Sequence, residues 1–259
     1  HFLTQADTAL PAFIRGFYVV GSIALDDYRP GGSDIDFIAV SADRPDPGEV
    51  ASLRRIHAGI QGRYRRPYFD GFYVTLDDLR RDPALAIGAL DAHEGRLTVR
   101  SIGLDPVTWE TLAHHGVPLR GPGREALGVW TDPAALARWT LENMGSYWRR
   151  WHARHARMPS LAGLYALGAW VPAWGALGVA RQHYTLATGA ITSKAGAGHY
   201  ALGAFPERWH RIVAECLRIR GEPSGRSLYP TPFARRREAL DFMTMVMDDA
   251  QRFSPGSAA

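Results

Sequence analysis

The sequence predicts an α/β N-terminal domain followed by an all-α helical-bundle C-terminal domain. Short apolar runs alternate with turn residues up to about residue 120, which is typical of an α/β fold. Strand signals vanish after residue 133, and a glycine- and proline-containing segment at 121–123 separates the two regions. We therefore expect two domains, residues 1–125 and residues 126–259.

Four runs in the N-terminal region are rich in β-branched and aromatic residues, as strands are. These predicted strands are residues 17–20, 36–40, 69–76 and 97–100. Between the second and third runs, Val50, Leu53, Ile56 and Ile60 recur three or four residues apart. That spacing predicts a helix over residues 49–63.

The C-terminal region begins with Asp132 and Pro133, which suit the N-cap and the first position of a helix. Six helices are predicted, namely residues 133–158, 161–170, 172–188, 193–202, 206–220 and 232–253. Six helices joined by short connections predict a bundle. The tail, residues 254–259, is expected to be frayed.

Composition excludes several classes of protein. Hydrophobic residues make up 46% of the 259 residues and charged residues 22%, as in globular chains, which excludes a disordered or collagen-like protein. The single cysteine, Cys216, excludes a disulfide scaffold and agrees with a cytoplasmic location. No apolar stretch reaches ~18 uninterrupted residues, so no membrane span is expected. The first residues show no secretory signal.

The net charge of +4 hides an asymmetry. Residues 1–125 carry a net charge of −3 and residues 126–259 one of +7. The asymmetry suggests a cleft whose walls differ in electrostatic potential, although ordinary solvated surface charge is the simpler interpretation of the same totals. The arginines are scattered rather than gathered in one stripe, so a nucleic-acid partner is not expected. We expect a monomer.

One segment of the N-terminal region contains residues suited to binding ligands. A predicted strand ends at Val20, and Gly21 and Ser22 follow where the chain turns. Glycine lets backbone N–H groups approach an anion closely, and the serine adds a hydroxyl donor. Asp34 and Asp36 open the next predicted strand. Strand side chains alternate with a period of two, so both carboxylates face the same way, ~7 Å apart along the strand.

Two carboxylates on one face repel each other unless a cation lies between them. Mg²⁺ suits such oxygen ligands, and it is usually shared between protein carboxylates and substrate phosphates. The turn and the carboxylate pair together predict a nucleoside triphosphate ligand. A third carboxylate, Asp70, enters the third predicted strand. It is predicted to be a metal ligand or the general base for an attacking hydroxyl, although an aspartate before Gly71 also suits a simple turn.

The segment from Gly21 and Ser22 to Asp34 and Asp36 resembles the nucleotidyltransferase superfamily of the DNA polymerase β type. Members of that superfamily carry Gly-Ser, about a dozen residues and then Asp-x-Asp. The resemblance implies that the N-terminal domain has the polymerase β-like nucleotidyltransferase fold.

A second pattern lies in the C-terminal half and is more specific. It resembles the Arg-x-x-Tyr-x-x-x-Thr-Gly-x-Ile-x-x-Lys pattern of the streptomycin/spectinomycin adenylyltransferases. The matching residues are Arg181, Tyr184, Thr188, Gly189, Ile191 and Lys194. By this resemblance ATP is the co-substrate: Gly21 and Ser22 hold its phosphates, Lys194 meets a phosphate, and Asp70 stands where the family has its catalytic-base Glu.

Three positions depart from that family. The family commonly has Trp where this chain has His183, and it has Asp where this chain has Ala195 and His199. Polycationic aminoglycosides need carboxylates to pair their charges. The departures therefore imply either an acceptor other than streptomycin or carboxylates from elsewhere, such as Glu142 or Asp132.

The sequence thus predicts an enzyme that transfers AMP from ATP, with Mg²⁺, to a hydroxyl of a small cationic acceptor. An aminoglycoside-type antibiotic is the expected acceptor, and pyrophosphate is the expected leaving group. Asp34, Asp36 and Asp70 are the expected catalytic residues and metal ligands. Two alternatives stay open: a nucleotidyltransferase acting on RNA ends or protein hydroxyls, and a non-catalytic nucleotide-binding protein.

Overall fold

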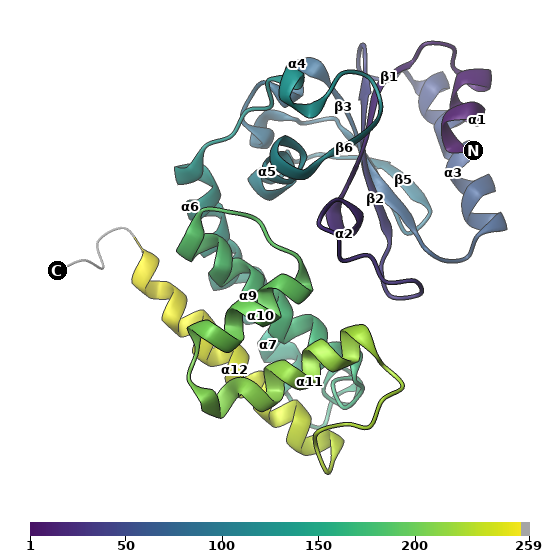
Figure 1. Ribbon diagram of the computed structural model, residues 1–259. Helices are drawn as coiled ribbons and strands as arrows, with labels where there is room; N and C mark the ends of the chain where they lie inside the picture. Colours follow the sequence, from purple (N-terminus) through teal and green to yellow (C-terminus); the bar gives the residue numbers. More distant parts are fainter. Residues whose placement is uncertain (255–259) are drawn as a thin grey trace. The chain divides into compact units, whose positions relative to one another are not determined.

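A computed structural model describes residues 1–254, so the prediction for the tail beyond Ser254 lies outside the described residues. The chain divides into two units, His1–Asp132 and Pro133–Ala259 (Figure 1). Each unit has a hydrophobic core of its own. No helix within residues 1–254 is long and apolar enough to cross a membrane.

The first unit is built on one six-stranded sheet with the strand order β5-β4-β3-β2-β1-β6. The strands are β1 (Ile14–Val20), β2 (Ile35–Ser41), β3 (Phe69–Thr75), β4 (Leu90–His93), β5 (Arg96–Val99) and β6 (Val117–Arg120). All neighbouring strands are antiparallel except β2 and β3. The four predicted strands are confirmed, and β4 and β6 are two that the sequence analysis missed.

The parallel pair β2 and β3 needs a crossover, and the helix α3 (Pro47–Arg63) supplies it. Asp46 caps this helix: its carboxylate accepts from the Glu49 N–H, and the Glu49 side chain accepts from the Asp46 N–H. Pro47 occupies the first turn, where its missing N–H costs nothing. The helix predicted over residues 49–63 is therefore confirmed, with two more residues at its start.

Helices cover both faces of the sheet. The other helices of this unit are α1 (Phe2–Ala9), α2 (Gly21–Ala24), α4 (Leu76–Leu79) and α5 (Pro106–His115). Figure 1 shows α1 and α3 on one side of the sheet and α5 on the other. Alternate strand residues enter two separate cores: Phe37 packs in the core that contains α3 residues, whereas Ile38 packs with Trp109 of α5. We call the second face the α5 face.

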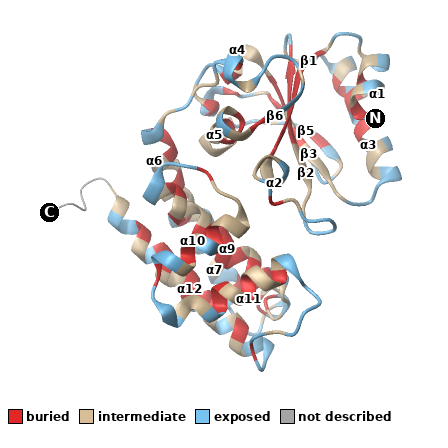
Figure 2. Cartoon of the chain, viewed as in Figure 1, coloured by how far each residue is buried: buried red, intermediate tan, exposed pale blue. Residues whose placement is uncertain are grey.

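The second unit is helical, as predicted. Its helices are α6 (Pro133–Asn143), α7 (Arg149–Ala156), α8 (Leu161–Tyr165), α9 (Trp170–Thr188), α10 (Lys194–Ala204), α11 (His210–Gly221) and α12 (Pro232–Asp249). One turn of π-helix, Met144–Trp148, joins α6 to α7. The helix α9 carries buried residues along most of its length and contacts α10, α11 and α12, so it is the centre of the bundle (Figure 2).

Several helix boundaries differ from the sequence-based expectation, and two of them lie between residues 161 and 172. The helix expected over residues 161–170 ends at Tyr165. Beyond it, the N–H groups of Leu167 and Gly168 donate to the carbonyl oxygens three residues back, those of Leu164 and Tyr165, which is the 3₁₀ rather than the α-helical pattern. The next helix begins at Trp170 rather than Pro172. Proline is tolerated in the first turn of a helix, so Pro172 does not mark the start.

Candidate functional site

The Gly21–Ser22 turn begins directly where β1 ends. Gly21 has φ +61°, in the left-handed region that favours glycine. A Cβ built on Gly21 would lie 2.1 Å from Oδ2 of Asp36. The position therefore needs glycine for two reasons, its backbone conformation and the close approach of Asp36.

Ser22 has an unusual hydroxyl. Its Oγ is buried and has no hydrogen-bond partner among the described residues. A buried polar atom without a partner costs free energy, so such an atom calls for a functional or structural explanation. A ligand group with acceptor oxygens, held beside the turn, would satisfy it.

Asp36 and Asp70 lie side by side on parallel neighbouring strands. Their Cα atoms are register partners in the pairing of β2 with β3. Val20, the residue before Gly21, is the register partner of Asp36 on the other side. Asp36 is two residues from Ile38 and Asp70 two from Phe72, and both apolar residues belong to the α5 face. By the strand period of two, both aspartates therefore belong to that face as well.

Asp34 precedes β2 and is held by the segment before β3. Its Oδ1 accepts a hydrogen bond from the Tyr68 backbone N–H at 3.1 Å. The Arg66 guanidinium lies 3.4 Å from the same oxygen and stacks over the Tyr68 ring, 3.9 Å from the ring centroid. The Asp34 side chain stays 38% exposed, so it is accessible to a ligand.

Both carboxylate oxygens of Asp70 are engaged by the turn between β4 and β5. The Glu94 backbone N–H donates to Oδ1 at 2.9 Å, and Nδ1 of His93 lies 3.0 Å from Oδ2. Burial, and more weakly the nearby Asp34 charge, raises the pKa of the Asp70 carboxyl, while the contacts with Glu94 and His93 oppose that rise. A carboxylate with a raised pKa is better suited to accept a proton than an ordinary one.

The aspartates near the Gly21 turn are the candidate ligands of a metal ion. Within residues 1–254, no group of three or more His, Cys, Asp or Glu side chains is arranged to hold a metal ion. Each Asp70 oxygen makes one contact with the β4–β5 turn, and its role as a third ligand stays a prediction. Asp34 and Asp36 are the other two predicted ligands, and Mg²⁺ commonly takes only one or two protein carboxylates together with substrate phosphates. These two carboxylates beside the Gly21 turn fit that arrangement.

Lys194 lies in the second unit as the first residue of α10. Its predecessor Ser193 caps this helix by accepting a hydrogen bond from the Gly196 N–H at 3.0 Å. A contact between Lys194 and an ATP phosphate stays a prediction.

The three positions that depart from the family pattern have different environments. His183 is fully buried, with Nδ1 2.8 Å from the Tyr200 hydroxyl and Nε2 2.7 Å from Oδ2 of Asp249. Burial lowers the pKa of His183, against the effect of Asp249. His183 thus belongs to an internal polar network of the bundle, whereas His199 is exposed and Ala195 is half-buried.

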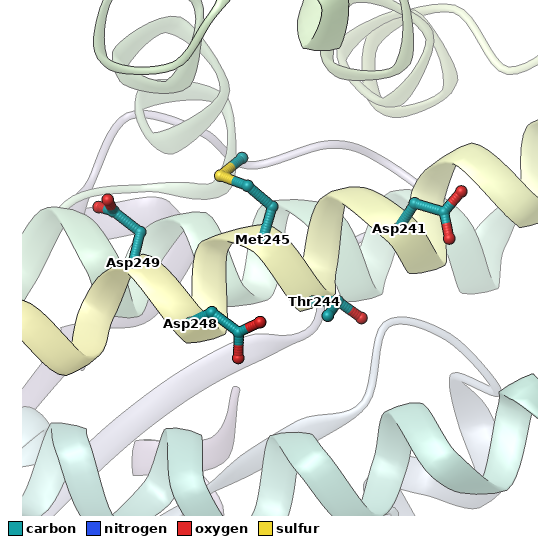
Figure 3. Close-up of a pocket in the computed structure, with 5 residues that line it drawn as sticks. All are labelled: Asp241, Thr244, Met245, Asp248 and Asp249. Carbon is teal, nitrogen blue, oxygen red and sulfur yellow. The ribbon is translucent and has the colours of Figure 1, made fainter.

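A separate hollow of about 570 Å³ lies along α12 and holds none of the predicted site residues. Its lining residues are Asp241, Thr244, Met245, Asp248 and Asp249. Figure 3 shows Asp249 and Met245 on one side of the helix and Asp248 and Thr244 on the other, so their polar groups do not converge. Asp248 pairs with Arg149, and Asp249 pairs with His183. The hollow therefore lacks the geometry of a catalytic site.

Sequence reasoning missed the residues that hold the aspartates. His93 and Glu94 contact Asp70, and Arg66 and Tyr68 contact Asp34. The available signal for the first pair was Gly95, which together with Glu94 forms a two-residue hairpin turn. The strand β4 that carries His93 is short and was not predicted, so the hairpin was not recognised.

Three comparisons place this chain among known proteins. Residues 152–229 match the family model described as aminoglycoside adenylyltransferase, C-terminal domain. The chain is similar in structure to spectinomycin adenyltransferase AAD(9) from Enterococcus faecialis, solved with ATP and spectinomycin. That similarity has a TM-score of 0.65 at 12% identity and covers 93% of this chain and 96% of that one. No curated protein matches the sequence at a significant level.

The chain shares the fold of AAD(9), in which an α/β unit is followed by a helical unit. Residues 152–229 are similar to the C-terminal domain of the aminoglycoside adenylyltransferases.

Proposed function

We propose that this enzyme transfers AMP from ATP to a hydroxyl of an aminoglycoside-type antibiotic and releases pyrophosphate. The observation that carries the proposal is the position of Asp36, beside Asp70 on one side and against Gly21 on the other. A carboxylate pair beside a glycine-opened turn provides a phosphate site, a metal site and a proton acceptor in one place. The family match in the helical unit supports an antibiotic as the acceptor.

Gly21 and Ser22 bind the ATP phosphates. The glycine lets the backbone come close to an anion, and the Ser22 hydroxyl, which has no partner among residues 1–254, donates to a phosphate oxygen. Lys194 contributes an ammonium group from the second unit.

Asp34 and Asp36 hold Mg²⁺. When bound, the ion stabilises the negative charge that develops on the α-phosphate and the leaving pyrophosphate. Asp34 is oriented by the Tyr68 N–H, so its second oxygen, Oδ2, is left for the ion. Arg66 balances the charge of Asp34 in the structure, and its exposed, flexible side chain can move to a phosphate of the incoming nucleotide.

The proton of the acceptor hydroxyl is removed at Asp70, which lies one strand away from Asp36. It is taken either by the Asp70 carboxylate, whose pKa burial raises, or by a side chain that this carboxylate orients. Two observations bear on the identity of the acceptor. AAD(9) was solved with spectinomycin, and this chain lacks the two family aspartates at Ala195 and His199. We therefore rank spectinomycin before the more highly charged streptomycin.

The test is a screen for pyrophosphate release with ATP and Mg²⁺ over a panel that includes spectinomycin, streptomycin and hygromycin. Transfer of radioactive label from ATP to one antibiotic supports the proposal. Label in an RNA or protein band would identify a macromolecular acceptor instead, and ATP binding without any pyrophosphate release would identify a non-catalytic protein.

Asp34→Asn tests the metal assignment in the same assay. Losing a metal ligand should cost several kcal/mol of transition-state stabilisation, which lowers kcat/KM by about 10²-fold or more. The matched control is Asp77→Asn, because Asp77 lies in α4 with its side chain 75% exposed. Unchanged turnover in Asp34→Asn would refute the metal site.

A further inference from the structure

Asp36, Asp70 and His93 form a row across three neighbouring strands. Asp36 pairs with Asp70 across β2 and β3, and the pairing of Gly71 with Ala92 places His93 opposite Asp70 across β3 and β4. The Ala92 side chain packs in the core that contains α3 residues. Because side chains alternate along a strand, the next residue, His93, belongs to the α5 face with the two aspartates. The imidazole therefore lies about two strand spacings, ~10 Å, from the predicted metal ligand.

The donor and the acceptor of the hydrogen bond between His93 and Asp70 can be assigned. Nδ1 lies 3.0 Å from Oδ2 of Asp70, and an ionised carboxylate can only accept hydrogen bonds. Nδ1 therefore carries the hydrogen in the neutral ring, and Nε2 keeps its lone pair. The His93 side chain is 72% exposed while that of Asp70 is 14% exposed. Nε2 has no hydrogen-bond partner within the described residues, so the basic nitrogen is accessible.

The turn that carries His93 is held in an uncommon conformation. Glu94 and Gly95 form the two-residue connection between β4 and β5, with φ values of +48° and +76°. A left-handed conformation is unfavourable for glutamate, and it occurs where the surroundings enforce it. Here the Glu94 N–H donates to Asp70, and Gly95 packs so closely on α3 that a Cβ would lie 2.7 Å from Cγ of Gln61. The fold thus fixes both groups that contact Asp70.

From this geometry we propose that His93 is the catalytic base of the transfer reaction and that Asp70 is its positioning residue. The proposal rests on the proposed function. Nε2 of His93 takes the proton of the acceptor hydroxyl, and the freed oxygen forms a bond to the α-phosphorus of ATP. The bond from that phosphorus to the pyrophosphate oxygen breaks, and pyrophosphate leaves with the electron pair. Asp70 stabilises the resulting imidazolium, which then returns the proton to water.

This arrangement explains why an aspartate can stand where the family has a glutamate. The carboxylate of Asp70 is shorter by one methylene, and both of its oxygens are occupied by the β4–β5 turn. An imidazole hydrogen-bonded to it extends the reach of the basic group toward solvent. A carboxylate that orients an exposed histidine is a general solution for activating a hydroxyl.

Two substitutions of His93 distinguish a catalytic base from a residue that makes only a structural contact. His93→Asn keeps an amide donor near the position of Nδ1 but has no basic nitrogen, whereas His93→Ala removes both. Both variants should lose kcat by about 10²–10⁴-fold, the usual contribution of general base catalysis, with little change in the KM for ATP. Added imidazole should partly restore the rate of His93→Ala. The matched control is His114→Asn, an exposed histidine 3.0 Å from Glu110 on α5.

Nitrogen-15 NMR gives a readout that does not depend on turnover. At a pH where the ring is neutral, His93 should be the Nδ1–H tautomer, and Asp70→Ala should remove this preference. An Nε2–H tautomer in the wild-type protein, or near-normal kcat in His93→Asn, would overturn the role of His93 and leave the proposed function standing. If the wild-type enzyme released no pyrophosphate with any acceptor, the proposed function would fail and this inference with it.

Discussion

Gly21 and Asp36 are in such close contact that no side chain fits between them. A Cβ on Gly21 would meet Oδ2 of Asp36 at 2.1 Å, although the two residues are 15 positions apart in the sequence. The antiparallel pairing of β1 with β2 creates this approach, because Val20 is the register partner of Asp36. The proposed phosphate turn and the proposed metal ligand Asp36 are therefore one structural unit.

Gly21→Ala should abolish activity while a matched glycine substitution does not. Gly31 has φ +78° and nothing within 4 Å of its added Cβ, so Gly31→Ala has the same backbone cost, about 1 kcal/mol, without the clash. Thermal unfolding and ATP titration of both variants check this. Equal activity in the two variants would show that the contact with Asp36 is unimportant.

Ser22→Ala should weaken ATP binding without destabilising the fold. The Ser22 hydroxyl is buried without a partner, and such a group costs about 1–3 kcal/mol, so removing it should leave the unfolding temperature unchanged or slightly higher. Calorimetric titration with ATP and a thermal melt give the two readouts. Ser52→Ala on α3 is the control, because its hydroxyl bonds within the same helix. Unchanged ATP affinity would argue against a phosphate contact at Ser22.

His57 should make the first unit less stable as the pH falls from about 6.5 to 4. Its Nε2 lies 2.7 Å from the Tyr73 hydroxyl in the core, and burial lowers its pKa to about 4 from the usual 6.5. Between these values the unfolded chain binds the proton and the folded chain does not, so stability is complete above pH 6.5 and declines below it. His57→Gln, which can still bond to Tyr73, should flatten this part of the curve of unfolding free energy against pH. An unchanged slope would contradict the assignment, and the exposed His114→Gln is the control.

Glu215 should stabilise the second unit, and its contribution should depend on pH in a lower range than that of His57. Burial alone would raise its pKa, but hydrogen bonds from Arg218, the Leu228 N–H and the Ser227 hydroxyl lower it to about 2 from 4.5. Its stabilisation is thus present above pH 4.5 and is lost as the pH falls toward 2.

Glu215→Gln should cost about 3–5 kcal/mol at neutral pH, because it leaves the cations of a buried ion pair without their carboxylate. Chemical denaturation of this variant and of the exposed Glu207→Gln measures the difference. Equal stability of the two variants would show that the ion pair does not support the bundle.

Local patterns predicted most of the fold. The spacing of Val50, Leu53, Ile56 and Ile60 predicted α3, and the proline-bounded apolar segments predicted the helices of the second unit, because helix formation depends on residues close in sequence. The strands β4 and β6 have four residues each, too few for a periodic pattern to stand out. Their positions depend on pairing with distant strands, which no local window contains.

The sequence by itself determined that a Gly-Ser turn and an Asp-x-Asp pair precede a helical domain with an aminoglycoside adenylyltransferase pattern. Both motifs are local, so they can be read along the chain. Only the tertiary structure decided that Asp70 stands beside Asp36, that His93 contacts Asp70, and that His183 is buried rather than accessible. These relationships arise from strand register and helix packing between residues far apart in sequence, where the free energy of burial, rather than local preference, selects the neighbours.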